Sequence, residues 1–346
     1  MKGKEREEEE MKKNMKKLLS LLLCLAMIFC MAACGSEEPA PAGDGDAAAV
    51  DHSDQEYAYV TTVSTVPYWV DTQAGLKDAG EWLGVKTTFV GPTDNDVTAQ
   101  IQQIDELIGK GVDGIIVFGA DSAVGEAINR AIDAGIPVIT DNSDVPSSDR
   151  LMFTGFDGHA MGMTGAAVMD ELLGGKGKVI IGGFPSESVL AREQGYIDYF
   201  EENTDIEVVA VINDEADPVK APEIYAQAIA ANPDIDGIIG TDGDSGKAIA
   251  MALEDAGLAG KVKVVCMDRN EDMLPYIESG TIDASIADKA YTCAFTGVCM
   301  LYWYNNEIIN PINGWKEKGI NPLFSTVDSG VMVITKDNVA DFYHNK

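Results

Sequence analysis

The chain has 346 residues, which is long enough for two domains that each bury a core. Hydrophobic residues make up 46% of the sequence and charged residues 24%, the balance of a globular protein and not of a disordered one. Acidic residues outnumber basic ones by 57 to 25, and the resulting net charge of -32 repels phosphate backbones and argues against binding to nucleic acid.

The first 33 residues predict a secretory signal peptide. Basic residues at positions 12–17 precede an apolar run over 18–33, and small residues come just before Cys34. A retained membrane anchor is the alternative, but it needs about 20 apolar residues, and this run is shorter. We therefore expect cleavage before Cys34 and an extracytoplasmic chain.

The residues Met31-Ala32-Ala33-Cys34 resemble the bacterial lipoprotein box, in which the cysteine thiol carries a diacylglycerol. The resemblance implies lipidation of Cys34, so that the chain is anchored to the outer face of the cell membrane or lies in the periplasm. Residues 34–55 are rich in Ala, Pro, Gly and Asp and have no periodicity, which predicts a flexible tether.

From Glu56 onward, short apolar runs alternate with longer amphipathic stretches. Apolar strands without polar alternation, separated by helices, indicate parallel sheets covered on both faces. The sequence thus predicts the α/β class. The expected strands are Tyr57–Val63, Val85–Val90, Gly114–Phe118, Pro137–Thr140, Lys178–Ile181, Val208–Ile212, Gly237–Ile239 and Val262–Met267, and the expected helices include Thr98–Lys110, Val124–Ala134, Ala191–Glu202 and Ile224–Ala231.

An internal repeat predicts two similar lobes. Asp113-Gly-Ile-Ile begins a strand that is followed by a helix, an Ala-Gly stop and another strand, and the same order starts again at Asp236-Gly-Ile-Ile. Gly135 and Gly257 fall where a helix ends with a left-handed residue. The alternative is a chance match between common α/β segments.

The cysteines and the apparent catalytic motifs favour neither a metal site nor an enzyme. Cys266, Cys293 and Cys299 lie in apolar segments and are odd in number, which predicts buried thiols; a pair of Cys293 with Cys299 stays open, although their spacing is poor for a bridge. The tetrapeptide Gly243–Gly246 is found around some serine-protease nucleophiles, but that chemistry needs a histidine base, and the chain has only three histidines. The sequence predicts no catalytic residue, no metal ligand and no cofactor.

Several segments in order resemble the periplasmic binding proteins of the ribose-binding type, over residues 56–346. They are Pro67-Tyr68-Trp69, GPTDNDVTAQIQQIDELI from Gly91, GVDGIIV from Gly111, AGIPVIT from Ala134, Ala191-Arg192-Glu193-Gln194-Gly195, NPDIDGIIGTDG from Asn232, Val264 to Asp268 and VMVITKDNV from Val331.

The resemblance implies two doubly wound, Rossmann-like lobes joined by a three-strand hinge, with the ligand in the cleft between them. The first lobe is expected at 56–155 plus 289–322, and the second at 156–288 plus 323–346. It further implies a monomer that captures a monosaccharide and delivers it to the permease and ATPase of an ABC importer, touching the membrane only through its lipid anchor. The alternative is a sensor that presents its ligand to a chemoreceptor or histidine kinase.

The resemblance also names the ligand-binding residues, most of which follow strands. Ligands of open α/β sheets bind at the carboxyl ends of strands. Aromatic faces are expected against the sugar ring, and carboxylates with one guanidinium against its hydroxyls. The alternatives are core packing for the aromatic residues and turn or helix caps for the aspartates. The residues are Tyr68, Trp69, Asp141, Asn142, Arg192, Asp242, Asp268 and Asp288.

The expected cleft is more acidic than that of the ribose binders. Val66 stands where the family often has Asn, Asp242 where Asn is frequent, and Asp288 where Gln or Asn is usual. These departures leave ribose itself in doubt. A deoxysugar, a pentose, a polyol or a cationic solute therefore stays open as the ligand.

Overall fold

The computed structural model describes residues 51–215 and 217–344. The predicted signal peptide, Cys34 and the predicted tether up to residue 50 lie outside the described residues. Within the described ranges, no helix is long and apolar enough to cross a membrane, and no cluster of His, Cys, Asp and Glu has the arrangement of a metal site.

The first lobe is built on a six-stranded sheet in the order β11-β5-β4-β3-β1-β2, with every pairing parallel. Its strands are β1 (Glu56–Val60), β2 (Lys86–Val90), β3 (Gly114–Phe118), β4 (Val138–Asn142), β5 (Met152–Gly155) and β11 (Thr326–Asp328). Its helices are α2 (Trp69–Leu83), α3 (Val97–Lys110), α4 (Gly125–Asp133) and α10 (Ala290–Asn305), with the 3-10 turn η1 at Ser122–Val124.

The second lobe is built on a six-stranded sheet in the order β12-β10-β9-β8-β6-β7, in which only the pairing of β12 with β10 is antiparallel. Its strands are β6 (Lys176–Gly183), β7 (Asp205–Asn213), β8 (Gly237–Gly240), β9 (Lys263–Met267), β10 (Ala284–Ala287) and β12 (Met332–Thr335). Its helices are α5 (Gly158–Leu173), α6 (Glu187–Asn203), α7 (Ala221–Ala231), α8 (Ser245–Asp255) and α9 (Leu274–Ser279), with the 3-10 turn η2 at Val339–Phe342.

The two lobes repeat one design, as the internal repeat predicted. In both sheets the first strand of the lobe lies between the second and the third. Asp113, before β3, accepts a hydrogen bond from the Glu56 amide of β1, and Asp236, before β8, accepts the matching bond from the Lys178 amide of β6. Gly135 and Gly257 adopt φ values of 85° and 66°, which confirms the predicted left-handed helix ends.

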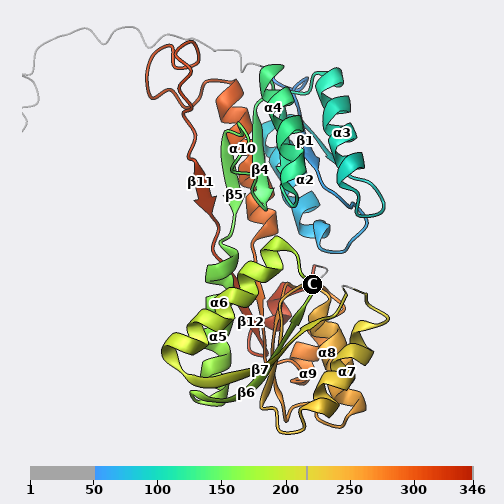
Figure 1. Cartoon of the computed structure of the whole chain (residues 1–346). Coiled ribbons are helices and arrows are strands. Elements are labelled where there is room, and N and C mark those ends of the chain that lie inside the picture. The colour runs from blue at the N-terminus through green and yellow to red at the C-terminus, as the bar shows by residue number, and fades with distance from the viewer. Residues whose placement is uncertain (1–50, 216, 345–346) are drawn as a thin grey trace, which may run out of the picture. The chain divides into compact units, whose positions relative to one another are not determined.

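Three connections run from one sheet to the other in the described part of the chain, after β5, after β10 and after β11. Helix α10 and strand β11, which come late in the chain, lie with the elements of the first lobe (Figure 1). The predicted boundary at residue 322 is wrong by a few residues. Thr326–Asp328 pairs with β5 and extends the first sheet before the chain crosses to β12.

Both faces of each sheet are buried, as continuous apolar strands predict. On the first sheet, one core packs under α3 and α4 and the other under α2 and α10; on the second, one packs under α7, α8 and α9 and the other under α5 and α6. Cys266, Cys293 and Cys299 are free and buried, which confirms the predicted thiols.

Helices α5 and α6 cross so closely that glycine is needed at the contact. A Cβ added at Gly162 of α5 would lie 2.0 Å from the backbone oxygen of Arg192, and one at Gly195 of α6 would lie 2.1 Å from that of His159. These glycines let the two backbones meet. The same crossing holds Arg192 beside the start of α5, which follows β5 in the chain.

Candidate functional site

Tyr68 lies at the N-terminal end of α2, after the loop that follows β1, and its hydroxyl joins two other predicted site residues. The hydroxyl donates a hydrogen bond of 2.7 Å to the Asp288 carboxylate and accepts one from the side-chain amide of Asn142. Burial is the main cause that raises the pKa of Tyr68, with the neighbouring carboxylates second. The phenol therefore stays protonated and remains a donor.

Trp69 packs into the first lobe. Its side chain is 2% exposed, and its ring lies 4.8–5.9 Å from the rings of Tyr59, Tyr68, Phe89 and Phe118. This aromatic cluster fixes the start of α2 against the sheet. The structure thus shows the core packing that was the alternative for this residue, and a ligand contact by Trp69 stays a prediction.

Asp141 and Asn142 were predicted to follow the strand, and they are instead its last two residues, since β4 runs to Asn142. Asp141 is 1% exposed and accepts a hydrogen bond of 3.0 Å from the Tyr59 hydroxyl. Burial raises the pKa of Asp141 to about 8, with the Asp288 charge adding to the effect. Asn142 has a φ of 64°, a conformation that Asn tolerates better than most residues and that is common at functional sites.

Asp288 stands between β10 and α10, on one of the connections between the sheets. Its carboxylate accepts the Tyr68 hydrogen bond, so it contacts the first lobe at the point where the chain leaves the second. Burial raises the pKa of Asp288, while the Tyr68 hydrogen bond and the charge of Arg192 oppose that shift.

Arg192 projects from α6 and is 7% exposed. Its guanidinium donates a hydrogen bond of 3.0 Å to the Thr241 carbonyl and lies 5.3 Å from the centre of the Phe156 ring. Its positive charge opposes the rise that burial causes in the pKa values of Asp268 and Asp288. Arg192 is thus a cation whose charge acts on both carboxylates.

Asp268 follows β9 and adopts a φ of 67°. Burial raises the pKa of Asp268 to about 7; the charge of Arg192 opposes the shift, and the charges of Asp288, Asp242 and Asp244 add to it. No donor in the described part of the chain reaches its carboxylate, although its backbone oxygen accepts a bond from Ser285. Asp268 lines the pocket, so its carboxylate is in reach of a donor placed there.

Asp242 serves as a cap, which was the alternative for the strand-end aspartates. One carboxylate oxygen accepts bonds from the Asp244 and Ser245 amides and from the Ser245 hydroxyl, at 2.7–3.0 Å. The other accepts a bond of 3.2 Å from the Phe184 amide. Both oxygens are therefore occupied by the start of α8 and by the loop after β6, so the predicted ligand contact is not supported for this residue.

A pocket of about 190 Å³ lies among three of the predicted residues, Tyr68, Asp268 and Asp288. Both lobes contribute to its wall, since Tyr68 belongs to the first lobe and Asp268 to the second. This volume lies below the range of about 300–1,000 Å³ that is typical for drug-sized ligands, and it suits a smaller molecule. The remaining lining residues are Pro67, Val70, Asp71, Arg269, Asn270, Glu271, Ala290 and His344.

The model of the periplasmic binding protein domain matches residues 57–306, which is most of the chain. The chain belongs to the periplasmic binding protein family. It is 28% identical to the D-allose-binding periplasmic protein of Escherichia coli (strain K12), over 71% of this chain and 83% of that protein.

Two solved structures are also similar to this periplasmic binding protein. AraP, an arabinose-binding protein from Geobacillus stearothermophilus, matches with a TM-score of 0.77 and 28% identity, covering 84% of this chain and 99% of that one. A solute-binding protein of an ABC transporter from Burkholderia graminis, solved in complex with D-arabinose, matches with a TM-score of 0.76 and 28% identity, over 84% and 99%. These matches confirm the predicted two-lobed α/β fold.

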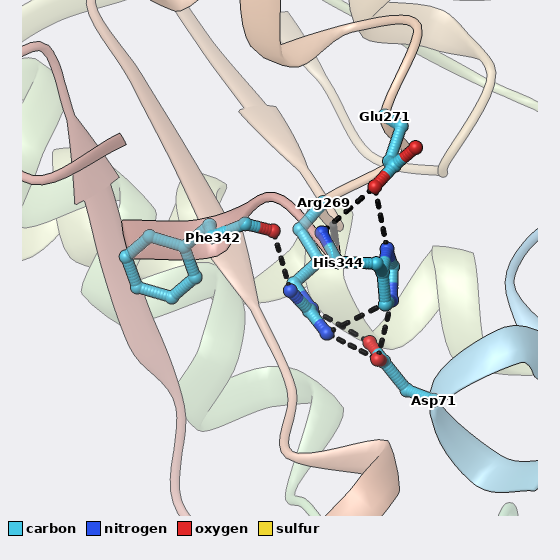
Figure 2. Close-up of polar contacts among 5 residues, drawn as sticks. All are labelled: Asp71, Arg269, Glu271, Phe342 and His344. Atoms are coloured by element: carbon cyan, nitrogen blue, oxygen red, sulfur yellow. Dashed lines mark hydrogen bonds and ion pairs between the residues drawn. The ribbon is translucent and has the colours of Figure 1, made fainter. Parts of the chain in front are cut away.

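The rim of the pocket in this periplasmic binding protein holds a charged cluster that the sequence analysis did not predict. Arg269, after β9, forms a forked ion pair with Asp71 of α2 and donates a bond of 2.6 Å to the Phe342 carbonyl. His344 contacts Asp71 at 2.7 Å and Glu271 at 2.9 Å through its two ring nitrogens (Figure 2). Arg269 directly follows Asp268 and Asp71 lies two residues after Trp69, but their pairing has no local signal.

Three predicted site residues keep a buried polar atom that has no partner. These atoms are Oδ1 of Asp141, Nε of Arg192 and the indole nitrogen of Trp69. Leaving such an atom unpaired costs about 1–3 kcal/mol, and each case in a folded protein calls for an explanation. None of these three residues lines the pocket.

Proposed function

We propose that this periplasmic binding protein captures a monosaccharide between its lobes and delivers it to the permease and ATPase of an ABC importer. The observation that carries the proposal is the pocket lined by Tyr68, Asp268 and Asp288. It brings together a phenol of the first lobe, a carboxylate of the second lobe and a carboxylate on a connection between the two sheets. The sugar-binding names of the similar proteins support the same class of ligand.

The ligand contacts that we propose are hydrogen bonds from sugar hydroxyls to buried charged groups. Asp141, Asp268 and Asp288 would accept from the hydroxyls, and Arg192 and Asn142 would donate to them. Hydrogen bonds to charged groups contribute about 1.5–3 kcal/mol each. Contacts with both lobes favour their approach, which is the closure by hinge motion known for periplasmic binding proteins. The proposed role is non-catalytic and needs neither cofactor nor metal.

The cellular setting is part of the proposal. The signal peptide at 1–33 would direct the chain out of the cytoplasm, and a lipid on Cys34 would hold it at the membrane surface. One copy of the chain contains both walls of the pocket, which suits a monomer.

Ligand binding by the purified full-length chain tests the proposal directly. We expect one monosaccharide, among pentoses, hexoses and deoxysugars, to raise the midpoint of thermal unfolding by several degrees, since a ligand at 100 times its Kd stabilises the native state by about 2.7 kcal/mol. Calorimetric titration then gives the affinity. Stabilisation by amino acids alone, with no response to any saccharide, would contradict the proposal.

Substitution of Arg192 shows whether the response comes from this pocket. Arg192→Lys keeps the charge but loses the planar fork, so we expect sugar affinity to fall at least 10-fold. Arg130→Lys is the matched control, because Arg130 pairs with Asp105 on the surface and should leave the affinity unchanged. Equal affinity in both variants would place the sugar elsewhere.

Delivery to an importer and sensing predict different effects of deleting the gene. Deletion of the gene should abolish uptake of the radiolabelled sugar if the protein serves an importer. Unchanged uptake combined with loss of sugar-dependent gene expression would instead support the sensor.

A further inference from the structure

Two of the predicted site carboxylates, Asp268 and Asp288, line the pocket, and a third, Asp141 of β4, does not. Together they carry more negative charge than the protein itself neutralises. Asp141, Asp268 and Asp288 are absent from the ion pairs of the described residues. Arg192 is the cation that acts on Asp268 and Asp288, and it is one charge against two. Buried charges are ordinarily paired, so this surplus is unusual.

The basic side chains on the rim contact other groups of the protein. The Arg269 guanidinium donates two hydrogen bonds to the Asp71 carboxylate and one to the Phe342 carbonyl. His344 lies between Asp71 and Glu271. The rim thus adds two carboxylates, Asp71 and Glu271, while the Arg269 charge is already paired with Asp71, so the surplus at Asp268 and Asp288 stays in place.

Burial and the neighbouring negative charges raise the pKa values of these carboxylates. Burial and the charges of Asp288, Asp242 and Asp244 raise the pKa of Asp268 to about 7, against the attraction of Arg192. Around Asp141, burial and the Asp288 charge raise the pKa to about 8, against the hydrogen bond from Tyr59.

For Asp288, burial and the charge of Asp71 raise the pKa, against Tyr68 and Arg192. Without a further positive charge, the three groups cannot all be ionised at pH 7 at low cost.

Two unpartnered polar atoms belong to residues that do not line the pocket but whose charges interact with Asp288. Asp141 and Arg192 are both more than nine-tenths buried, and each keeps one polar atom with no partner. The Asp268 carboxylate lines the pocket and has no donor among the described residues. Hydroxyls of a neutral sugar would fill these positions but bring no charge. An ammonium group has three donors and the missing positive charge.

We infer that the ligand is a cationic polyhydroxylated molecule, an amino sugar or amino polyol, whose ammonium group lies against the Asp268 and Asp288 carboxylates. This inference rests on the proposed function and narrows its ligand class. The hydroxyls of the same molecule form hydrogen bonds with Arg192, Asn142 and Asp141. Binding of the cation favours the ionised carboxylates, so protons leave the site as the ligand enters.

Matched ligands test the charge without altering the protein. We would titrate the full-length chain calorimetrically with glucosamine, galactosamine and 1-amino-1-deoxysorbitol, with their parent hexoses and sorbitol, and with N-acetylated forms that lack the charge. At least one amine is expected to bind 10-fold or more tightly than its parent, and N-acetylation should abolish that advantage. Titrations at pH 7 in buffers of different ionisation heats should show proton release on amine binding.

One substitution tests the place of the ammonium group. In Asp288→Asn, which keeps an acceptor for Tyr68, the preference for the amine over its neutral parent should fall at least 10-fold. Asp234→Asn is the matched control, because Asp234 pairs with Lys178 on the exposed surface. Far-UV circular dichroism checks that both variants fold.

The possible outcomes separate the two proposals. A neutral sugar that binds as tightly as every amine, or tighter, overturns the cationic ligand and leaves the proposed function standing. Binding of no saccharide, charged or neutral, overturns both. An unchanged amine preference in Asp288→Asn overturns the assigned position of the ammonium group.

Discussion

A buried aspartate such as Asp141 makes the stability of the protein depend on pH. Its pKa is raised to about 8 in the folded chain by burial, whereas in the unfolded chain it titrates near 3.8. Between these values the folded state holds a proton that the unfolded state has lost. The contribution of Asp141 to stability is therefore greatest toward pH 4 and is lost as the pH rises to about 8. Asp268, whose pKa is raised to about 7, acts in the same direction.

The substitution Asp141→Asn isolates this effect. The amide cannot ionise but still accepts the Tyr59 bond, so we expect the ligand-free variant to match the wild type near pH 5. At pH 8 we expect it to be more stable by about 1–3 kcal/mol. Urea unfolding at pH 5, 6.5 and 8 measures the difference.

The surface control for this prediction is Asp234→Asn. Lys178 lowers the pKa of Asp234, so its removal should not stabilise the protein at pH 8. A wild-type stability that stays flat or rises between pH 5 and 8 would contradict the predicted pKa of Asp141.

At the scale of the elements, close packing of α5 on α6 determines where Arg192 stands. Gly162 faces the Arg192 backbone at a distance that leaves no room for a methyl group. The two helices cover one face of the second sheet, above a core that includes Met169 and Phe200. A shift in this contact would move the guanidinium away from Asp268 and Asp288.

Two glycine substitutions compare a crowded helix position with an open one. Gly162→Ala forces α5 and α6 apart, and we expect a loss of about 1–3 kcal/mol in the free energy of unfolding. Gly109→Ala, on α3 with nothing within 4 Å of the added Cβ, should instead stabilise by about 0.5–1 kcal/mol. Denaturant unfolding of both variants gives the two signs, and a stabilised Gly162→Ala would refute the packing argument.

At the scale of the whole molecule, the pair of Arg269 with Asp71 is a link between the lobes. Asp71 lies on α2 of the first lobe, and Arg269 follows β9 of the second. Both side chains are mostly shielded from solvent, so the pair is worth more than a typical surface ion pair. It favours the arrangement in which the two lobes approach each other.

A double-mutant cycle measures this link. Arg269→Ala and Asp71→Ala should each weaken ligand affinity several-fold, and the double variant should be little worse than either, because both break one pair. The control Lys247→Ala removes a pair with Asp272 that lies within the second lobe and should leave affinity unchanged. Fully additive losses would show that the two residues act independently.

The sequence by itself determined the class of the fold and its two lobes, and it placed Asp268 and Asp288, which line the pocket, after strands. Apolar runs and glycine stops are local signals, and they predicted β3 at Gly114–Phe118 and the repeat of β3-α4-β4 as β8-α8-β9. Strands β5, β10, β11 and β12 are only three or four residues long, too short for a clear pattern.

Only the tertiary structure decided which polar residues meet. Tyr68 bonds with Asp288 across 220 positions of sequence, and Arg269 with Asp71 across 198. It also assigned Asp242 to a cap and Trp69 to the core. Hydrophobic periodicity reports how each segment is buried, whereas these contacts depend on how separate segments pack together, and that packing leaves no periodic trace in the chain.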